Sequence, residues 1–434
     1  MDNILFSTFM IASIKLQLNG LFVSPKDRFV MKPVKIGLIR EGKIPHDSRV
    51  ALTPAQCKWL QAHRTGLSFI VQPSPGRCYK DEEYDRAGIP LSEDLTACDI
   101  LLGIKEVPVG DLIDHKTYLF FSHTKKKQPQ NRKLLQAILE KKITLIDYEC
   151  LEHEDGKRII GFGFFAGIVG AHNGLMAYGN RTGLFQLDRV YKQKNFKELI
   201  HTYFGLKLPN LKIAITGSGR VAHGLLEIMN LMGVHEVEPD EYLERRFNYP
   251  VYTQLKGHDL YEQPGTGAYN RLNFHEHPQR YESRFGSYTR QTDILLNGVY
   301  WYEGVPRLFE MDDISRNDFI IETIADVSDD ENGSVPINKQ TQTIDDPVYG
   351  IDRATKEVTA PYQKNSIDIM AVGNLPNELP RDASRYFGEQ LIKFVLDDLL
   401  NAGSEILTRA TIARNGALGK EYAYLQDYAG QNNV

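Results

Sequence analysis

Short apolar runs alternate with helical segments over the first third of the chain. Apolar runs typical of buried strands occupy residues 34–39, 68–71, 100–104, 118–121 and 143–147. Segments with helical spacing of apolar residues lie between them at 54–62, 81–87 and 131–141. Alternating strands and helices predict a mostly parallel sheet, whose ligands bind beyond the carboxyl ends of the strands.

A second strand, turn and helix begin at residue 211. The apolar run 211–216 is followed by a glycine turn and then by Leu225, Leu226 and Met229 at helical spacing. This is the context in which a G-x-G-x-x-A sequence binds a dinucleotide, with the pyrophosphate at the helix N-terminus. The alternative is a turn whose glycines serve packing alone. The dinucleotide-binding residues predicted here are Gly217, Ser218, Gly219, Arg220 and Val221.

An acidic residue follows the next predicted strand. That strand covers residues 235–238, and Asp240 comes 23 positions after Gly217. A carboxylate in this place can accept hydrogen bonds from both ribose hydroxyls, and it repels the 2′-phosphate of NADP. Arg245 and Arg246 are close enough in sequence to accommodate that phosphate. We therefore expect NAD(P) as cofactor, with NAD slightly favoured.

Composition limits the class of protein. A chain of 434 residues exceeds one ordinary core, so two domains are expected. A net charge of −5 without a basic cluster argues against a nucleic-acid partner. The four cysteines lack metal or redox spacing, and the acidic turn 329–333 lacks the ligand spacing of an EF-hand. The sequence thus predicts a cytoplasmic protein without a metal site.

The first thirty residues differ in character from the rest of the chain. Residues 4–23 are apolar, but Asp2 replaces the basic start of a signal peptide and Lys15 interrupts the run. The run is also too broken to cross a bilayer. We expect residues 1–30 to lie outside the fold, and we expect no membrane partner.

Four polar residues lie just beyond predicted strand ends: Arg49, Lys105, His123 and Gln128. Taken singly, a lysine at a strand end is usually solvated and a lone histidine is usually structural. Together they suit acid–base chemistry, because a desolvated lysine and a histidine both titrate near neutral pH. The planar fork of an arginine suits a substrate carboxylate.

These residues stand in segments that resemble a known family. Residues 120–124, 161–167 and 375–384 resemble the L-lysine-forming saccharopine dehydrogenases, in particular the lysine–ketoglutarate reductase half of the bifunctional animal and plant enzyme. The resemblance extends from about residue 34 to residue 400. More distantly, residues 49–54 are similar to alanine dehydrogenase and to the N-terminal region of transhydrogenase.

The resemblance implies an oxidoreductase that joins L-lysine and 2-oxoglutarate and reduces their imine to saccharopine, or runs in reverse. It implies Lys105 and His123 as the acid–base pair. Animal and plant relatives use NADPH and fungal relatives use NAD. The resemblance implies substrate contacts at Arg49, Gln128, Lys157, Arg158 and Phe162, with either Lys157 or Arg158 reaching the site, and cofactor contacts beside the nicotinamide at Tyr300, Asp326, Val327 and Asn374.

One position departs from the family. Relatives carry aspartate before an Asn-Leu-Pro or His-Leu-Pro sequence, whereas this chain has Gly373 before Asn374. Asp368 lies five positions earlier and is not an obvious substitute. Two alternatives therefore stay open. An alanine-dehydrogenase-like enzyme would use the same side chains on pyruvate and ammonia, and a non-catalytic dinucleotide-binding sensor would turn over neither substrate pair.

The predicted fold class is α/β, with two Rossmann-like domains whose parallel sheets flank a central cleft. Residues 31–170, completed by 375–434, form the substrate domain, and residues 171–374 form the dinucleotide domain. Helices at 167–184 and 383–400 link the two. Residues 244–290 are polar and aromatic, which indicates a surface insertion or else a lid or subunit contact. A monomer or a homodimer is expected.

Overall fold

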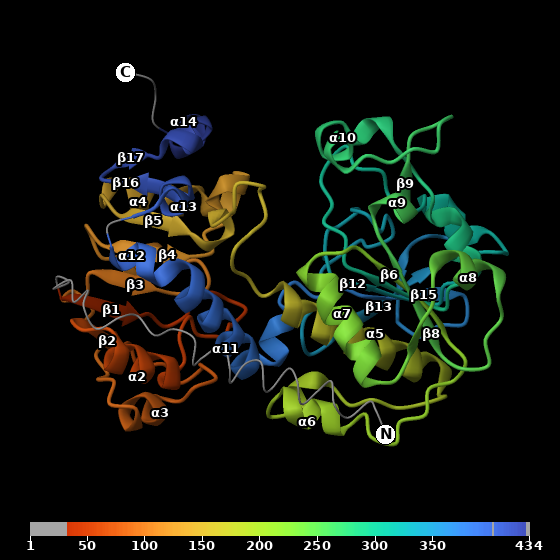
Figure 1. Ribbon diagram of the computed structural model, residues 1–434, viewed down its shortest axis with the longest axis horizontal. Helices are drawn as coiled ribbons and strands as arrows, with labels where there is room; N and C mark the ends of the chain where they lie inside the picture. Colours follow the sequence, from red (N-terminus) through yellow and green to blue (C-terminus); the bar gives the residue numbers. More distant parts are fainter. Residues whose placement is uncertain (1–32, 402, 431–434) are drawn as a thin grey trace.

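The computed structural model describes residues 33–401 and 403–430, so the prediction for residues 1–30 concerns residues outside this range. Within it, two β-sheets form two lobes, each covered by helices (Figure 1). The predicted α/β class with two parallel-dominated sheets is confirmed.

The first sheet has the strand order β17-β16-β5-β4-β3-β1-β2. Strands β1 to β5 are mutually parallel, whereas β16 pairs antiparallel with β5 and β17 with β16. The C-terminal segment thus returns to complete this sheet. The strands are β1 (Val34–Leu38), β2 (Leu67–Val71), β3 (Ile100–Leu102), β4 (Thr117–Phe120), β5 (Thr144–Asp147), β16 (Thr411–Arg414) and β17 (Ala417–Leu418).

Three helices of the first lobe begin and end close to the predicted positions, whereas the two near the C-terminus have no predicted counterpart. Thr53 caps the first of them, since its hydroxyl accepts from the Gln56 N–H and Pro54 takes the first helical position. The helices are α2 (Pro54–His63), α3 (Asp81–Arg86), α4 (Arg132–Glu140), α13 (Glu405–Ala410) and α14 (Gln426–Ala429).

The second sheet has the order β14-β13-β15-β12-β11-β6-β8-β7. Six neighbouring strands from β7 to β15 run parallel, and β13 and β14 add an antiparallel edge. The strands are β6 (Lys212–Thr216), β7 (His235–Glu236), β8 (Val251–Leu255), β11 (Ile294–Asn297), β12 (Thr323–Asp326), β13 (Val348–Asp352), β14 (Val358–Thr359) and β15 (Ser366–Met370).

The segment 244–290 is not wholly a surface insertion, as the sequence suggested. Its residues Val251–Leu255 form β8, a strand between β6 and β7. The prediction failed because this strand is built partly from Tyr252 and Thr253, which are β-formers buried in the core despite their hydroxyls. The remainder contains α9 (Gly257–Leu260), β9 (Tyr261–Glu262), α10 (Arg271–Glu276) and β10 (Glu282–Ser283), and its aromatic side chains share one core with the sheet.

Helix α5 (Gly163–Thr182) starts four residues before the predicted linking helix and packs on α7 (Arg220–Leu231). The contact is backbone to backbone. A Cβ at Gly167 would collide with the Val221 carbonyl oxygen, and one at Gly224 would collide with the Phe164 carbonyl oxygen. Glycines therefore bring the helix of the dinucleotide turn against the start of the linking helix.

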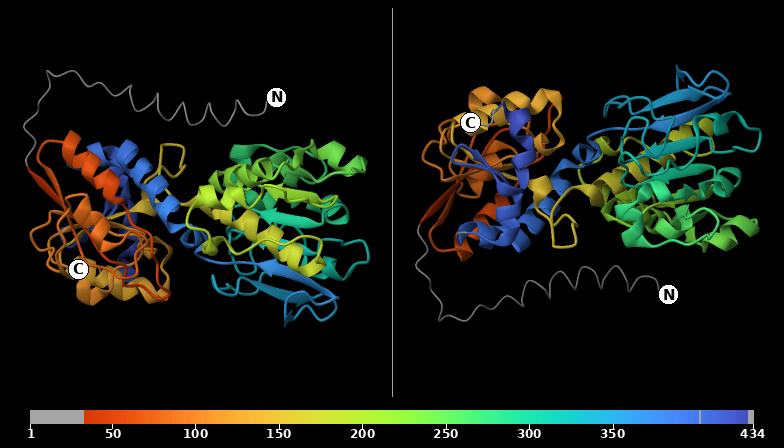
Figure 2. Two further views of the ribbon diagram at one scale, coloured as in Figure 1. Left: turned by 90° about the horizontal axis from the view of Figure 1, so that it is seen from below. Right: turned by 90° about the horizontal axis from the view of Figure 1, so that it is seen from above.

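The second linking helix is divided into three parts. It runs from α11 (Pro380–Leu391) through a π-helical segment (Ile392–Leu396) into α12 (Asp397–Leu400). Helix α11 and the N-terminal end of α5 lie where the two lobes meet, and the rest of α5 packs on β11, β12 and β15 of the second sheet (Figure 1, Figure 2). No helix in the described part of the chain is long and apolar enough to cross a membrane.

Candidate active site

The glycine turn stands at the carboxyl end of β6. Gly217 has φ +99°, and a Cβ there would lie 3.0 Å from the Gly298 carbonyl oxygen. Ser218 and Gly219 are exposed, and a Cβ at Gly219 would meet nothing within 4 Å. The turn therefore leaves open backbone at the start of the twelve-residue helix α7, which fits a dinucleotide pyrophosphate.

Two residues of the turn face protein. Arg220 is half-buried, and its Nη1 donates to the Ile159 carbonyl oxygen of the first lobe at 3.2 Å. Val221 packs near Gly163 and Gly298. Their side chains therefore connect the turn to its surroundings, which leaves contact with a pyrophosphate to the backbone.

The strand order removes the basis for Asp240 as the ribose-binding acid. The strand beside β6 is β8, and β7 lies beyond it at the sheet edge. Glu236, the last residue of β7, is level with Ile213, three residues short of Thr216 at the carboxyl end of β6. Asp240 lies exposed in the first turn of α8 (Pro239–Glu244). Local sequence could not reveal this order.

The residues predicted beside the nicotinamide differ in exposure. Asp326 is fully buried, and its carboxylate accepts from Asn297 Nδ2 and Asn338 Nδ2, each at 2.8 Å, and from Ser328 Oγ at 2.7 Å. It thereby fixes the ends of β11 and β12. Val327 packs against Gly170 of α5, whereas Tyr300 is 70% exposed.

Arg49 is held rigidly. Its Nε lies 2.9 Å from Asp47 Oδ1 and its Nη2 lies 2.5 Å from Asp47 Oδ2, and both side chains are buried. Nη2 also donates to Asn374 Oδ1 at 2.6 Å. Within the described residues no acceptor bonds Nη1, which leaves it for a ligand. Asn374, predicted beside the cofactor, thus contacts the predicted substrate arginine.

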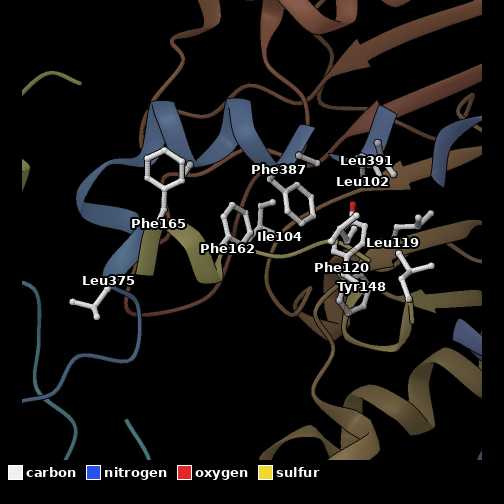
Figure 3. Packing of buried hydrophobic residues seen from close by; sticks show 14 of the residues in the cluster. Leu102, Ile104, Leu119, Phe120, Tyr148, Phe162, Phe165, Leu375, Phe387 and Leu391 are labelled. Atoms are coloured by element: carbon white, nitrogen blue, oxygen red, sulfur yellow. The ribbon is translucent and has the colours of Figure 1, made fainter. Parts of the chain in front are cut away.

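An aromatic stack supports this guanidinium. The Arg49 guanidinium carbon lies 4.1 Å from the ring centroid of Phe162. The Phe162 ring stacks on Phe387 of α11, with centroids 4.5 Å apart and planes 8° apart (Figure 3). The residue predicted as a substrate contact therefore lies under the substrate arginine and links it to the second linking helix.

Lys105 lies three residues beyond β3, where the Glu41 carboxylate binds the backbone. Glu41 accepts the backbone N–H groups of Ile104 and Lys105 at 2.7 and 2.8 Å. Burial and the nearby Arg49 charge lower the pKa of Lys105 to about 8, against the opposing effect of Asp47. Burial, and then the Asp47 charge, raise the pKa of Glu41 to about 8.

His123 lies three residues beyond β4, the strand next to β3, in a left-handed conformation with φ +52°. Its Nε2 is 4.0 Å from Glu106 Oε1, and its Nδ1 is 3.8 Å from Glu149 Oε2. Glu106 in turn binds Lys43 Nζ at 2.7 Å. The imidazole therefore stands between two carboxylates, 23% exposed.

Several basic side chains surround the Glu149 carboxylate and pair with it. Its Oε1 lies 2.5 Å from Arg158 Nη2 and 3.1 Å from Lys126 Nζ. Burial alone would raise the pKa of Glu149, but His123, Arg158 and the neighbouring lysines outweigh it and hold that pKa well below the usual range.

The other predicted substrate residues differ in whether their side chains reach the site. Lys157 is mostly exposed and pairs with Asp155, so Arg158 is the member of the basic pair that reaches the His123 side. The Gln128 side-chain oxygen accepts from Gln130 and Asn131, each at 3.2 Å, within its own turn. The structure thus brings together Arg49, Lys105, His123, Arg158, Phe162 and Asn374.

Sequence reasoning missed the carboxylates of this site. Asp47, Glu41, Glu106 and Glu149 surround the basic residues, and Asp329 with Asp330 follows β12. Burial raises the pKa of Asp329 to about 7 and that of Asp330 to about 6. Glu106 directly follows Lys105, and Asp47 lies two residues before Arg49, which was the available signal in the sequence.

Comparison with known proteins shows what this chain is similar to. Residues 37–169 match the alanine dehydrogenase/PNT N-terminal domain family. The chain is 31% identical over 444 residues to mitochondrial alpha-aminoadipic semialdehyde synthase of Mus musculus, covering 91% of this chain and 48% of that protein. This chain thus spans about half the length of that relative. It is 26% identical over 405 residues to the L-lysine-forming, NAD(+) saccharopine dehydrogenase of Yarrowia lipolytica, covering 87% and 96%.

Two solved structures share the fold. An L-alanine dehydrogenase superposes with a TM-score of 0.61 at 16% identity, covering 91% of this chain and 99% of that one. A transhydrogenase from Sinorhizobium meliloti superposes with a TM-score of 0.57 at 14% identity, covering 88% and 99%. Together these matches support the L-lysine-forming saccharopine dehydrogenase family, and the alanine dehydrogenase and transhydrogenase N-terminal superfamily, as the relatives that this chain is similar to.

Proposed function

We propose that this chain catalyses the reductive condensation of L-lysine with 2-oxoglutarate to saccharopine, or the reverse oxidation, as an oxidoreductase acting on CH–NH donors. The observation that carries the proposal is the placement of Lys105 and His123 beyond neighbouring parallel strands, beside the buried Arg49. The near full-length match to an L-lysine-forming saccharopine dehydrogenase supports it.

In this proposal Arg49 binds the carboxylate attached to the keto carbon, because no acceptor in the described part of the chain bonds its Nη1 and its other donors are fixed by Asp47 and Asn374. Lys105 and His123 transfer the protons that turn the carbinolamine into an iminium ion and water. A lysine with a pKa of about 8 can both give and take a proton near neutral pH. A nicotinamide dinucleotide on the glycine turn supplies the hydride when bound.

We propose that the residues after β8, and not Asp240, decide between NADH and NADPH. Lys256 and His258 are exposed beyond the strand next to the glycine turn, and Gly217 N–H bonds the Leu255 carbonyl oxygen at 2.9 Å. Asp259 is engaged, since it accepts the Lys256 N–H at 2.8 Å and lies 3.3 Å from His258 Nε2. The positive charge of Lys256 in this place favours the 2′-phosphate of NADPH over NADH.

The test measures oxidation of NADPH and NADH with L-lysine and 2-oxoglutarate, with mass spectrometry of the product. Saccharopine formation supports the proposal. Turnover of pyruvate and ammonia alone would indicate an alanine-dehydrogenase-like enzyme, and cofactor binding without any turnover would indicate a sensor.

We propose the cytoplasm as the compartment of this chain. All four cysteines are free thiols, which suits a reducing environment.

Sedimentation of the purified chain decides between the monomer and homodimer.

A further inference from the structure

A short turn carries the chain from the second sheet into the second linking helix. This interlobe turn (residues 374–378) follows β15 and contains a 3-10 helix (Leu375–Glu378) that lies just before α11. The 3-10 helix packs on α5, the first linking helix. Inside the turn the Asn377 N–H bonds the Asn374 carbonyl oxygen at 2.9 Å, so the polar side chains of the turn share one hydrogen-bonded backbone.

Two asparagines of the interlobe turn bond the first lobe. Asn374 Oδ1 accepts from Arg49 Nη2 at 2.6 Å, and Asn374 Nδ2 donates to Asp47 Oδ2 at 3.2 Å. Asn377 Oδ1 accepts from the Ser48 N–H at 2.9 Å and from Ser48 Oγ at 2.8 Å. Three consecutive residues that include the predicted substrate arginine are therefore held by one turn that follows the second sheet.

The third polar side chain of the turn bonds the second lobe instead. Glu378 is buried, and its Oε1 accepts from Asn173 Nδ2 at 2.8 Å and lies 3.5 Å from Arg189 Nη2. Asn173 is a buried residue of α5, and Arg189 follows that helix in the chain. Arg189 is itself fixed, because its guanidinium donates to the carbonyl oxygens of Ile344 and Asp345. The carboxylate therefore anchors the interlobe turn to the second lobe.

A carboxylate buried to this extent depends on its partners. Burial raises the pKa of Glu378 to about 7, whereas the Arg189 charge and the Asn173 hydrogen bond lower it. Removal of the carboxylate leaves the mostly buried Arg189 guanidinium without its counter-charge, which is costly. Glu378 lies four positions after Asn374, so a displacement of this end of the turn reaches the residue that bonds Arg49.

We propose that Glu378 is a positioning residue for substrate binding: by anchoring the interlobe turn to the second lobe, it sets the place of Asn374 and thereby the orientation of the Arg49 guanidinium. The position of one lobe is in this way transmitted to the arginine of the other. The inference rests on the proposed function only for the identity of the ligand on Arg49, and not for the coupling between Glu378 and the arginine.

The first experiment needs no substrate. Hydrogen–deuterium exchange of the full chain, followed by mass spectrometry, measures peptides that cover residues 46–52 and include the Ser48 N–H bonded to Asn377. We expect Glu378→Ala to speed exchange of this amide at least about tenfold, because the turn loses its anchor. Glu378→Gln keeps an oxygen for Asn173 and should speed it by about threefold at most.

Two further variants complete this experiment. Asp382→Ala is the matched control, because this acid stands in the first turn of α11 but accepts the Phe196 N–H at 2.8 Å, away from the interlobe turn. It should leave exchange over residues 46–52 unchanged. Asn173→Ala removes the Glu378 bond from the α5 side and should speed exchange as Glu378→Ala does, which tests the proposal even if the latter variant does not fold.

The second experiment measures steady-state kinetics with L-lysine, 2-oxoglutarate and NADPH. We expect Glu378→Ala to raise the KM for 2-oxoglutarate about threefold or more, with kcat and the KM for NADPH within about twofold of wild type. In the Asn374→Ala background the same substitution should change that KM by less than about twofold, because the path to Arg49 is already broken. Glu378→Gln should restore most of the wild-type KM.

The outcomes separate the two proposals. Faster exchange over residues 46–52 in a chain that forms no saccharopine contradicts the proposed function alone. Unchanged exchange in both Glu378→Ala and Asn173→Ala overturns the positioning role, and equal acceleration by Asp382→Ala would show a general loosening and also overturn it. A KM effect of Glu378→Ala that is the same with and without Asn374→Ala would mean that Glu378 does not act through Asn374.

Discussion

Asn374 Oδ1 accepts a hydrogen bond from Arg49 Nη2 at 2.6 Å, although 325 positions separate the two residues in the chain. Asn374 follows the last parallel strand of the second sheet, whereas Arg49 belongs to the first lobe. Asp47 holds the other edge of the guanidinium. The orientation of the predicted substrate arginine therefore depends on both lobes. A ligand that binds Arg49 contacts a guanidinium that residues of both lobes hold in place.

This relationship predicts the effect of Asn374→Ala. A hydrogen bond to a charged group contributes about 1.5–3 kcal/mol, so we expect the KM for 2-oxoglutarate to rise roughly tenfold or more. Steady-state kinetics at fixed NADPH provide the measurement. Asn377→Ala is the control, since Asn377 bonds Ser48 and not Arg49. An equal rise in KM for both variants would show that the contact with Arg49 is not the cause.

The glycine turn offers a matched pair of substitutions. Gly219→Ala should leave the melting temperature unchanged, because φ is −89° and the added Cβ meets no atom within 4 Å, but it should weaken dinucleotide binding. Gly217→Ala should lower stability by about 1–2 kcal/mol, because φ is +99°. Thermal unfolding and NADPH fluorescence titration measure both effects. Normal NADPH affinity in Gly219→Ala would remove this turn from the cofactor site.

The sequence predicts local elements well because their signals are local. The apolar runs, the Thr53-Pro54 helix start and the glycine turn each depend on neighbouring residues, and the strands and helices begin and end near the expected positions. Strand order does not depend on neighbouring residues. Nothing near Asp240 in the chain indicates that β8 separates β7 from β6. Similarly, the hydrogen bond between Glu378 and Asn173 joins residues 205 positions apart, and no local pattern indicates it.

Cofactor preference follows from that strand order. We expect Lys256→Ala to weaken NADPH binding with little effect on NADH, because it removes a cation beyond the strand that adjoins the glycine turn. Asp240→Ala should leave the KM for both cofactors within twofold. Weaker NADH binding in Asp240→Ala would instead support the assignment made from sequence spacing.

Glu149→Gln should remove a contribution to stability that depends on pH in a defined direction. The pKa of Glu149 is lower in the folded protein than its unfolded value of about 4.3, so its ionised form stabilises the fold above that pH. We expect the variant to be less stable by about 1.5–3 kcal/mol at pH 7. This difference should shrink below about pH 4, because the unfolded chain then binds a proton that the folded wild type still excludes. Thermal unfolding from pH 7 to pH 3 tests this. Glu152→Gln, whose partner Lys125 lies 3.7 Å away at the surface, should cost under about 0.5 kcal/mol.

Lys105→Met should lower activity without lowering stability. Loss of a general acid–base group should lower kcat by about 10²- to 10⁴-fold, while Met keeps the apolar stem. The folded pKa of Lys105, about 8, lies below its unfolded value, so protonated Lys105 destabilises wild type at neutral pH. That cost fades as the pH rises from about 8 to 10.5, and is at most about 3 kcal/mol.

The methionine variant lacks this cost, so it should melt at a higher temperature than wild type at pH 7, and the difference should close towards pH 10.5. Lys133→Met, on the exposed side of α4, is the control and should show neither effect. His123→Gln should lower kcat similarly, and the double variant should lose less than the product of the single losses, because the two groups act as one unit. A near-normal kcat of Lys105→Met on L-lysine, 2-oxoglutarate and NADPH would contradict the proposed proton transfer, and a lower melting temperature at pH 7 would show that the Lys105 ammonium has a stabilising partner in the folded protein.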